Sequence, residues 1–367
     1  MKKSALQLFG VAGSVVIGLL GLSPTQAQIV PDSTLPVNSQ VGSCGAACTV
    51  INGGTVRGAN LFHSFQQFSI PTGGEAYFNN AAQIQNILTR VTGTSWSSID
   101  GLIRANGMAN LYLLNPNGIV FGPNARLDIG GSFVATTANS LKLPDGSEYS
   151  ATNPQAPPLL AVNLAPGVQF SARPVGSTII NRGNLTSGQD LTLAADKLDL
   201  QGQLQAGRDL TLQAQDTVQI RDTATVPFVA AAGNRLFVQG NQVDIAILNH
   251  PNSGLWSGGN LILQSGNPVV GDAHFYAGGN FQVEQLDGSA GSLLSPHDPI
   301  ILTKGDVTLG AYTGASLHIL AGGSVTLTTA TITGKGDEAT TINPSNTTSF
   351  NGTKTYADLA TFNLTTY

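Results

Sequence analysis

One short phrase recurs along the second half of the chain and constrains the fold more than any other feature. Each copy has a turn with Gly, then Asn, Asp, Arg or Ser, and then an alternating apolar strand such as Leu-Thr-Leu. Measured between the residues that precede the strands, successive copies lie 19, 26, 25, 20, 26 and 18 residues apart. A period of this size without a helical pattern predicts one coil of a β-solenoid per copy. The seven preceding residues are Asp190, Asp209, Arg235, Asn260, Asn280, Asp306 and Ser324.

Second apolar runs lie between the copies, at residues 197–200, 218–220 and 242–245, so each coil carries at least two strands. One phrase recurring in one orientation favours parallel stacking of equivalent strands, about 4.8 Å apart. We therefore predict an all-β fold, a right-handed single-stranded parallel β-helix with N-terminal capping strands and extra-helical loops. The alternative is a β-sandwich, which needs hairpins between antiparallel neighbours.

The N-terminal part lacks the tidy repeat but is rich in predicted strands, at residues 49–51, 60–65 and 109–114. Residues 81–88 are compatible with a helical turn or two, although strand or loop is favoured. Pro154, Pro157 and Pro158 mark an irregular excursion. Because an open stack of coils presents unpaired edges, this region must also cap the first coil.

Composition argues against other classes of protein. Only 10% of the residues are charged, 44 are Gly and 41% are hydrophobic, which disfavours a helical protein and is enough apolar content to fold. The net charge is −5 and no basic stripe is present, so nucleic acid is not expected as a partner.

The first residues have the pattern of an export signal. Lys2 and Lys3 precede an apolar stretch over residues 6–22, and Ser-Pro-Thr-Gln-Ala follows it at residues 23–27. We expect residues 1–27 to be a signal peptide that is cleaved after Ala27. The alternative, a membrane anchor, is disfavoured because four Gly residues interrupt the stretch and no basic stop-transfer flank follows.

Cys44 and Cys48 are the only cysteines, and they lie close together in a loop rich in Gly and Ala. After export into an oxidising compartment this spacing predicts one local disulfide, which stiffens a loop more than it stabilises a fold. The histidines show no ligand spacing, so we expect neither a metal nor a cofactor. The five are His63, His250, His274, His297 and His318.

An enzyme is the main alternative class, because parallel β-helices also host polysaccharide lyases and hydrolases. Their sites cluster carboxylates with Arg or Lys, and Asp190 and Asp209 are expected to stack one coil apart. The same repeat position also holds Asn and Ser, which are typical of side chains that bond turn backbone. No nucleophile elbow and no phosphate loop is evident. We expect no enzymatic activity, with an exported polysaccharide-acting enzyme as the alternative.

The segment Asn115-Pro116-Asn117-Gly118-Ile119 joins two strongly apolar strands. Proline at the second turn position presets φ, Asn at the first bonds back to the backbone, and Gly at the fourth takes left-handed geometry at little cost. On its chemistry alone the segment is a well-formed turn.

With its flanks, this turn resembles the signature of two-partner secretion domains, the haemagglutination-activity domains at the N-termini of filamentous haemagglutinins. The similarity covers residues 114–133, 60–68 and 99–103, and extends loosely from Gln28 to about Phe170. The family's Asn-Pro-Asn-Gly-Ile motif maps onto residues 115–119, as a transporter-recognition or fold motif. A second family motif is only approximated, at residues 153–155.

The resemblance implies a secreted or surface exoprotein that crosses the periplasm. There a cognate outer-membrane transporter, a barrel with periplasmic recognition domains, recognises its N-terminal domain. It also implies an adhesin-like role toward a host, cell-surface or carbohydrate ligand. We expect a two-partner secretion β-helix domain over residues 28–270, with its signature in 28–170. Further coils and a C-terminal tail follow over 271–367.

Overall fold

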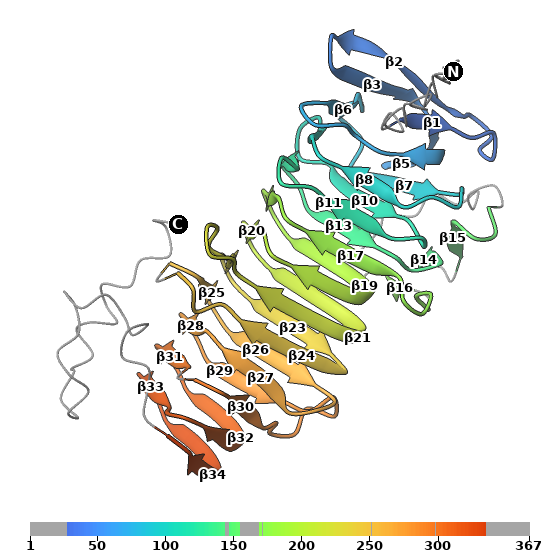
Figure 1. The fold of residues 1–367 in the computed structure, drawn as a ribbon. Coiled ribbons are helices and arrows are strands. Elements are labelled where there is room, and N and C mark those ends of the chain that lie inside the picture. The colour runs from blue at the N-terminus through green and yellow to red at the C-terminus, as the bar shows by residue number, and fades with distance from the viewer. Residues whose placement is uncertain are drawn as a thin grey trace, which may run out of the picture.

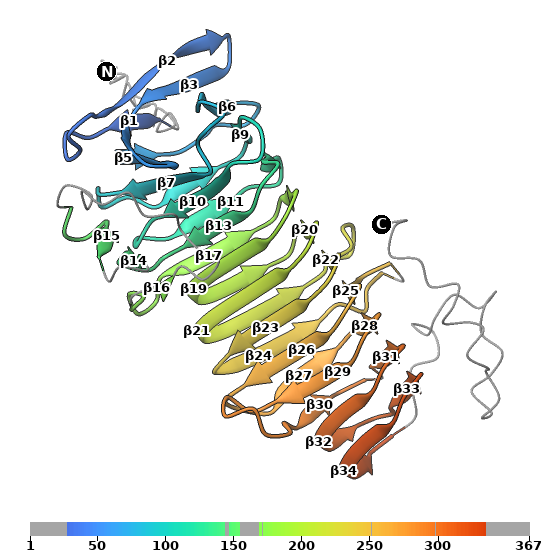
Figure 2. The same cartoon turned by 180° about the vertical axis from the view of Figure 1, so that it is seen from behind.

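The structure is a computed structural model that describes residues 28–143, 147–154, 169–170, 172–250, 252–297 and 299–334. Within these ranges every regular element is a strand, and the strands wind into an elongated parallel β-helix (Figures 1 and 2). The predicted all-β solenoid is therefore confirmed. None of these residues forms a helix long and apolar enough to cross a membrane. The expected signal peptide, its cleavage after Ala27 and the C-terminal tail beyond residue 334 lie outside the described residues.

Each coil has three faces. In the coil that starts at β23 (Leu236–Gly240), the chain continues along the second face as β24 (Gln242–Ala246) and along the third as β25 (Gly254–Ser257). The third faces form one 12-stranded sheet, whereas the first and second belong to one 19-stranded sheet. They are joined because four long strands bend around the shared corner: β19 (Leu191–Leu200), β21 (Leu210–Arg221), β32 (Val307–Gly314) and β34 (Val325–Ile332).

The remaining strands follow the same order. The first face also contains β5 (Asn60–Phe68), β7 (Asn86–Val91), β10 (Asn110–Leu114), β13 (Phe133–Thr136), β26 (Leu261–Ser265) and β29 (Phe281–Glu284). The second contains β8 (Ser97–Ile99), β11 (Ile119–Phe121), β17 (Thr178–Asn181), β27 (Val269–Asp272) and β30 (Leu293–Ser295). The third contains β3 (Cys48–Gly53), β6 (Glu75–Phe78), β9 (Leu102–Ala105), β12 (Arg126–Asp128), β18 (Asn184–Ser187), β20 (Gln203–Ala206), β22 (Val229–Ala232), β28 (His274–Ala277), β31 (Ile300–Thr303) and β33 (His318–Ala321).

The repeat phrase sets the register of the coils. The first apolar residue of each copy pairs in parallel with that of the next, and the inward side chains build one continuous core. The same column continues into the N-terminal coils, of which only the one at Gly130-Gly131-Ser132-Phe133 carries a form of the phrase. In order, the column is Leu61, Ile87, Leu111, Phe133, Leu191, Leu210, Leu236, Leu261, Phe281, Val307 and Val325.

The corner before the first face explains the polar residue of the phrase. Asp209 Oδ1 accepts a hydrogen bond from the backbone N–H of Arg235 at 3.0 Å, and Asn280 Oδ1 accepts one from that of Asp306 at 2.9 Å. These side chains therefore bond the backbone of the next coil rather than their own turn. The glycine of the phrase is needed for close stacking, because a Cβ on Gly233 would lie 2.2 Å from the carbonyl oxygen of Gly207.

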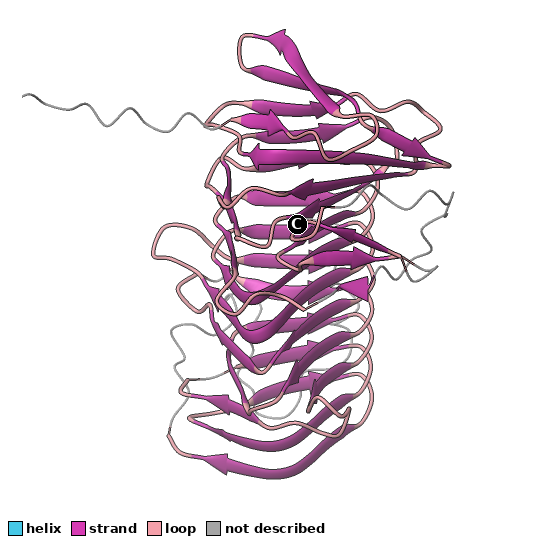
Figure 3. Ribbon diagram, turned by 90° about the vertical axis from the view of Figure 1, so that its right-hand side faces the viewer, coloured by secondary structure: helices cyan, strands magenta, loops and turns pink. Residues whose placement is uncertain are grey.

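The N-terminal end is closed by antiparallel strands, as expected of a cap. The strand β1 (Ile29–Pro31) and the short β4 (Thr55–Arg57) both pair antiparallel with β5. The hairpin of β2 (Ser39–Gly45) with β3 projects at this end, and Figure 3 shows it standing clear of the coils. Of the two hairpin strands, β3 joins the parallel stack of the third face by pairing with β6.

A small extra-helical sheet leaves the winding between β13 and β17. It is antiparallel and contains β14 (Ser140–Lys142), β15 (Glu148–Ser150) and β16 (Gln169–Phe170). Tyr149 and Leu141 of this sheet pack over outward side chains of the first face, Phe62 and Leu88 among them. The sheet thus buries an apolar patch on the outside of the N-terminal coils. Pro157 and Pro158 of the expected excursion lie outside the described residues.

Candidate functional site

The Asn115–Ile119 segment forms the corner between β10 and β11. The backbone N–H of Gly118 donates to the carbonyl of Asn115 at 3.1 Å, which closes the turn. Gly118 has a φ of +116°, a region that glycine adopts at little cost. A Cβ there would also come within 3.1 Å of the Thr178 carbonyl oxygen in the next coil. Glycine is therefore favoured at position 118 for two reasons, the backbone conformation of the turn and the close approach of the next coil.

Asn115 holds the turn from inside, since it has no exposed surface. Its Oδ1 accepts from the backbone N–H of Asn117 at 3.0 Å and from Asn117 Nδ2 at 2.9 Å. Its Nδ2 donates to the Ser95 carbonyl at 3.1 Å and to Ser97 Oγ at 3.0 Å. Asn115 therefore ties this turn to the preceding coil.

The other members of the motif divide between core and surface. Ile119 is fully buried and pairs with Ser97 on one side and Ile179 on the other. Asn117 is exposed, yet its Nδ2 also donates to the Gly93 carbonyl at 2.8 Å. Trp96, in the preceding coil, is 64% exposed beside the turn. The accessible surface here thus belongs largely to the neighbours of the motif.

Sequence reasoning missed a buried polar network near the cap. Arg90 on β7 is fully buried, and its Nε donates to Ser64 Oγ at 2.9 Å. Its Nη2 donates to Thr34 Oγ1 at 2.9 Å and its Nη1 to the Ser150 carbonyl at 2.7 Å. The guanidinium lies 4.4 Å from the ring centroid of Tyr149. Arg90 therefore joins the entry segment, two coils and the extra-helical sheet.

Asp32 is the acidic member of this network. It accepts hydrogen bonds from Ser64 Oγ at 2.7 Å and Thr92 Oγ1 at 2.6 Å. Burial raises the pKa of Asp32, but the hydrogen bonds from Thr92, Thr34 and Ser64 outweigh it and hold the pKa below its ordinary value. No local pattern announces the network, because its members come from four separate segments.

His63 on β5 is a core residue. It is 1% exposed, its ring contacts those of Phe65 and Phe78, and Nδ1 lies 3.0 Å from Ser39 Oγ. Burial lowers its pKa from 6.5 to about 3. An imidazole this deep and this weakly basic has a packing role rather than a catalytic one.

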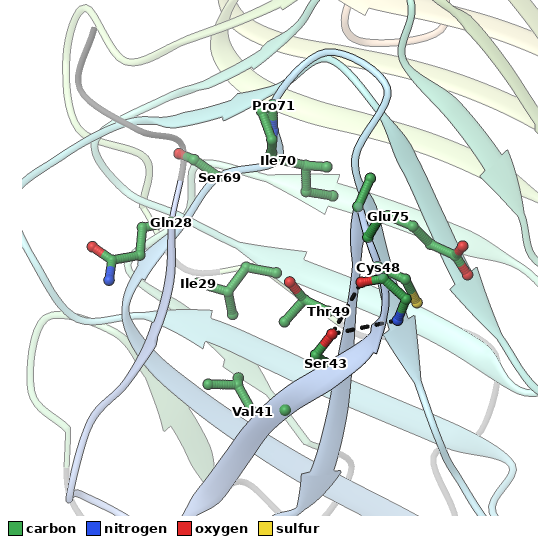
Figure 4. A pocket seen from close by; sticks show the side chains of 14 residues that line it. Gln28, Ile29, Val41, Ser43, Cys48, Thr49, Ser69, Ile70, Pro71 and Glu75 are labelled. Carbon is green, nitrogen blue, oxygen red and sulfur yellow. Dashed lines mark hydrogen bonds between the residues drawn. The ribbon is translucent and has the colours of Figure 1, made fainter. Parts of the chain in front are cut away.

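Cys44 and Cys48 form a disulfide at the turn of the β2–β3 hairpin, with a Cα–Cα distance of 5.0 Å. Beside it, a cavity of about 580 Å³ opens at the capped end of the helix (Figure 4). Its walls carry Ile29, Ile70 and Glu75, and Ser43 bonds the backbone of Gly45 across the hairpin turn. The cavity gathers no cluster of catalytic groups.

The two stacked carboxylates, Asp190 and Asp209, are both engaged in hydrogen bonds within the protein. Asp190 is bonded by Arg208, whose Nη2 lies 2.5 Å from Asp190 Oδ2, and by the backbone of Asp209. Asp209 accepts from Asn234 Nδ2 at 2.7 Å and from the backbone of Arg235. In the part of the chain that the structure describes, no three His, Cys, Asp or Glu side chains gather as a possible metal site.

The sequence model of the TPS secretion domain matches residues 27–283. Among solved structures, the HMW1 secretion domain of Haemophilus influenzae has 12% identity and a TM-score of 0.34, with 84% of this chain and all of that chain covered. The filamentous haemagglutinin secretion domain has 18% identity and a TM-score of 0.32, with 84% and 98% covered. No curated protein matches the sequence.

The family match spans well over half of the chain and includes both the cap and the Asn115–Ile119 corner. It rests on sequence alone and agrees with the parallel β-helix seen here. The chain belongs to the TPS secretion domain family.

Proposed function

We propose that this chain is the exported member of a two-partner secretion pair, and that its N-terminal coils are recognised in the periplasm by an outer-membrane transporter. As a member of the TPS secretion domain family, the chain is a two-partner secretion exoprotein. We propose in addition that the transporter recognises the signature-bearing coils of residues 28–170. It is supported by the concentration of irregular, individually specified features in that region.

The Asn115–Ile119 motif acts in this proposal by fixing the fold of those coils. The observation that carries it is that Asn115 has no exposed surface, while its side-chain Oδ1 and Nδ2 are both hydrogen-bonded within the protein. A side chain used in this way cannot contact a transporter without leaving its partners. Nearby exposed groups such as Trp96 are better placed for direct contact.

Outside the cell we assign the protein a non-enzymatic, adhesin-like role at the surface or in the medium. The support comes from the first face and its corner, where Gln213, Gln239 and Gln264 bond one another from coil to coil. The carboxylates of Asp190 and Asp209 are bonded to backbone groups and, for Asp190, to Arg208. The division into a secretion domain over 28–270 and further coils over 271–367 belongs to the same proposal.

The test expresses the chain with and without its transporter and measures the mature protein in the medium. We expect it there only with the transporter, and chain found outside without it would contradict the proposal. Asn115→Ala should lower secretion in step with faster hydrogen exchange in β8, β10 and β11. Secretion lost while exchange in these strands is unchanged would instead show that the motif itself contacts the transporter.

A matched control is available at the same corner further along the helix. Asn267 donates from Nδ2 to the Asn241 carbonyl of the preceding coil at 2.9 Å, much as Asn117 does to Gly93. Asn117→Ala should lower secretion, whereas Asn267→Ala should leave it unchanged because it alters a late coil. A loss equal to that of Asn117→Ala would mean that the signature-bearing coils have no special role.

A further inference from the structure

The corner between the second and third faces changes length along the helix. Two residues connect β17 to β18 there, and two connect β19 to β20. In the next two coils seven residues connect β21 to β22 and seven connect β24 to β25. These are the coils with repeat steps of 26 and 25 residues, against 19 for the coil before them. The added length forms two adjacent loops, which we call the corner loops: residues 222–228 and 247–253, of which Pro251 lies outside the described residues.

One carboxylate ties the two corner loops together. Asp222 Oδ2 accepts from the backbone N–H of Asn249 at 2.9 Å and from Ser253 Oγ at 2.9 Å. Asp222 Oδ1 accepts from Asn249 Nδ2 at 2.6 Å. Ser253 Oγ in turn accepts from the backbone N–H of Phe228 at 3.1 Å. The corner loops are therefore fixed to each other by side chains, and their arrangement is formed in advance of any ligand.

The corner loops line a cavity of about 230 Å³ on the outside of the third face. Strands β18 and β20 bring outward amide side chains to it, because Asn184 pairs in register with Gln203. Pro227 and Asn252 come from the corner loops. The lining residues are Asn184, Gln203, Leu204, Gln205, Pro227, Val229, Ala231 and Asn252.

The lining favours a neutral ligand that carries hydroxyl groups. Half of the lining residues have an amide side chain, which both donates and accepts hydrogen bonds, and none of them is charged. An anion would meet no Arg or Lys and a cation no carboxylate, so enclosing either charge would be unfavourable. Hydroxyl groups also donate and accept, whereas Pro227 and Val229 offer apolar contact to C–H groups. A sugar ring presents both kinds of surface.

A peptide is the main alternative among neutral ligands. Extended peptides bind by adding a strand to a free sheet edge, but β20 is already paired with β18 and β22, and β22 is paired with β25. The volume of the cavity is also below the about 300–1,000 Å³ of sites for drug-sized ligands. It suits one sugar ring better than a stretch of polypeptide.

We propose that the cavity between β20 and the corner loops binds a neutral monosaccharide unit. Gln203 of the third face and Asn252 of a corner loop hydrogen-bond the sugar hydroxyls, and Pro227 packs on the C–H groups of the ring. Asp222 is a positioning residue, since it acts by holding the two corner loops together. The inference rests on the adhesin-like role proposed above and gives that role a class of ligand.

The test measures binding of the methyl glycosides of glucose, galactose, mannose and N-acetylglucosamine to the purified mature chain by ligand-observed NMR. We expect at least one of them to bind with a Kd on the order of 1 mM, since a single ring makes few contacts. Gln203→Ala combined with Asn252→Ala should weaken that binding at least about tenfold. The matched control is Gln219→Ala, which removes an exposed amide of the second face and should leave the Kd unchanged.

The positioning role of Asp222 is tested without altering the lining. Asp222→Ala frees the corner loops from each other and should weaken binding by about tenfold as well. Asp222→Asn keeps one acceptor oxygen and should weaken binding less. Hydrogen exchange in β20 and β22 should stay unchanged in every variant, which shows that the coils are intact.

Three results would overturn the proposal. They are the absence of binding for all four glycosides, binding that survives the double variant, and tighter binding of glucuronic acid or triglycine than of every glycoside. Release of free reducing sugar from a bound glycoside would support the cavity as a sugar site but contradict the non-enzymatic role. A failure to bind leaves export untouched, because the requirement for the transporter is measured separately.

Discussion

The N-terminal coils and the repeat coils share one winding but are specified in different ways. From Leu191 onward most coils repeat the same corner, with a glycine stacked on a glycine and a polar side chain such as Asp209 or Asn280 bonded to the next backbone. The coils just before that point already share this corner, since Gly130 is stacked on Gly107 and Asn110 Oδ1 accepts from the backbone N–H of Ser132. The N-terminal coils also contain contacts that occur only once, such as the Arg90 network and the Asn115 turn. The comparison separates a part that starts the helix from a part that extends it.

This difference has a physical origin. An internal coil has neighbours on both sides, so a repeated solution is sufficient. The first coil has a free edge and must be capped, which requires antiparallel strands and contacts that occur only once. A segment used for recognition during export is also expected to differ from the repeats that follow it.

Loss of Arg90 should be the most damaging single change. Arg90→Met leaves Asp32 and Ser64 without their buried cationic neighbour, so we expect local opening of β5 and β7 to become easier by about 3–5 kcal/mol. The matched control is Arg221→Met, which removes a partly exposed ion pair with Asp244 and should cost no more than about 1 kcal/mol. Native-state hydrogen exchange measures both. Equal effects would remove the distinction between the two regions.

Acid should weaken the N-terminal coils first. The pKa of His63 is about 3 in the folded chain against 6.5 for the ordinary group, so the unfolded state binds more protons below pH 6.5. Stability contributed by neutral His63 is therefore lost as pH falls from about 6.5 toward 3, by about 3 kcal/mol at pH 4. His63→Gln should flatten this dependence in exchange measured for β5. A pH profile that is the same in the variant would show that His63 is not its source.

The repeat coils should depend on their glycine corner. Gly233→Ala places a Cβ 2.2 Å from the Gly207 carbonyl oxygen, so we expect a loss of about 2 kcal/mol in the stability of β21 and β23. Gly42→Ala on the cap hairpin meets only Val50 Cγ1 at 3.5 Å and should stay within about 0.5 kcal/mol of wild type. Chemical denaturation of both variants, followed by hydrogen exchange, measures the two losses of stability. A tolerated Gly233→Ala would mean that the corner is not tightly stacked.

The sequence was informative where the structure is periodic. Recurring positions such as Leu191, Leu210 and Leu236 predicted both the parallel fold and its register, because one phrase in one orientation has few ways to stack. The turn geometry at Asn115–Gly118 was also readable, since proline and glycine restrict the backbone locally. The polar residues of the phrase bond the backbone of the next coil rather than that of their own turn. This could not be predicted from the sequence, because it depends on how the coils stack.

The rest depends on contacts between distant segments. Arg90 meets Thr34, Ser64 and Ser150, which are 56, 26 and 60 residues away, and no periodicity links them. Most N-terminal coils also lack the phrase, so their place in the same column was not predicted. The extra-helical sheet is equally non-local, because β14 pairs with β16 across a long excursion.

The central claim is that equivalent residues lie in register, one coil above the next, along a single axis. Spin labels on the outside of the first face test it directly, with Thr192 paired in turn with Gln282, Thr308 and Thr326, which lie four, five and six coils away. Pulsed electron resonance should give Cα separations of about 19, 24 and 29 Å, a constant step of about 4.8 Å per coil. Separations without that constant step, or a pair at six coils closer than a pair at four, would contradict the account.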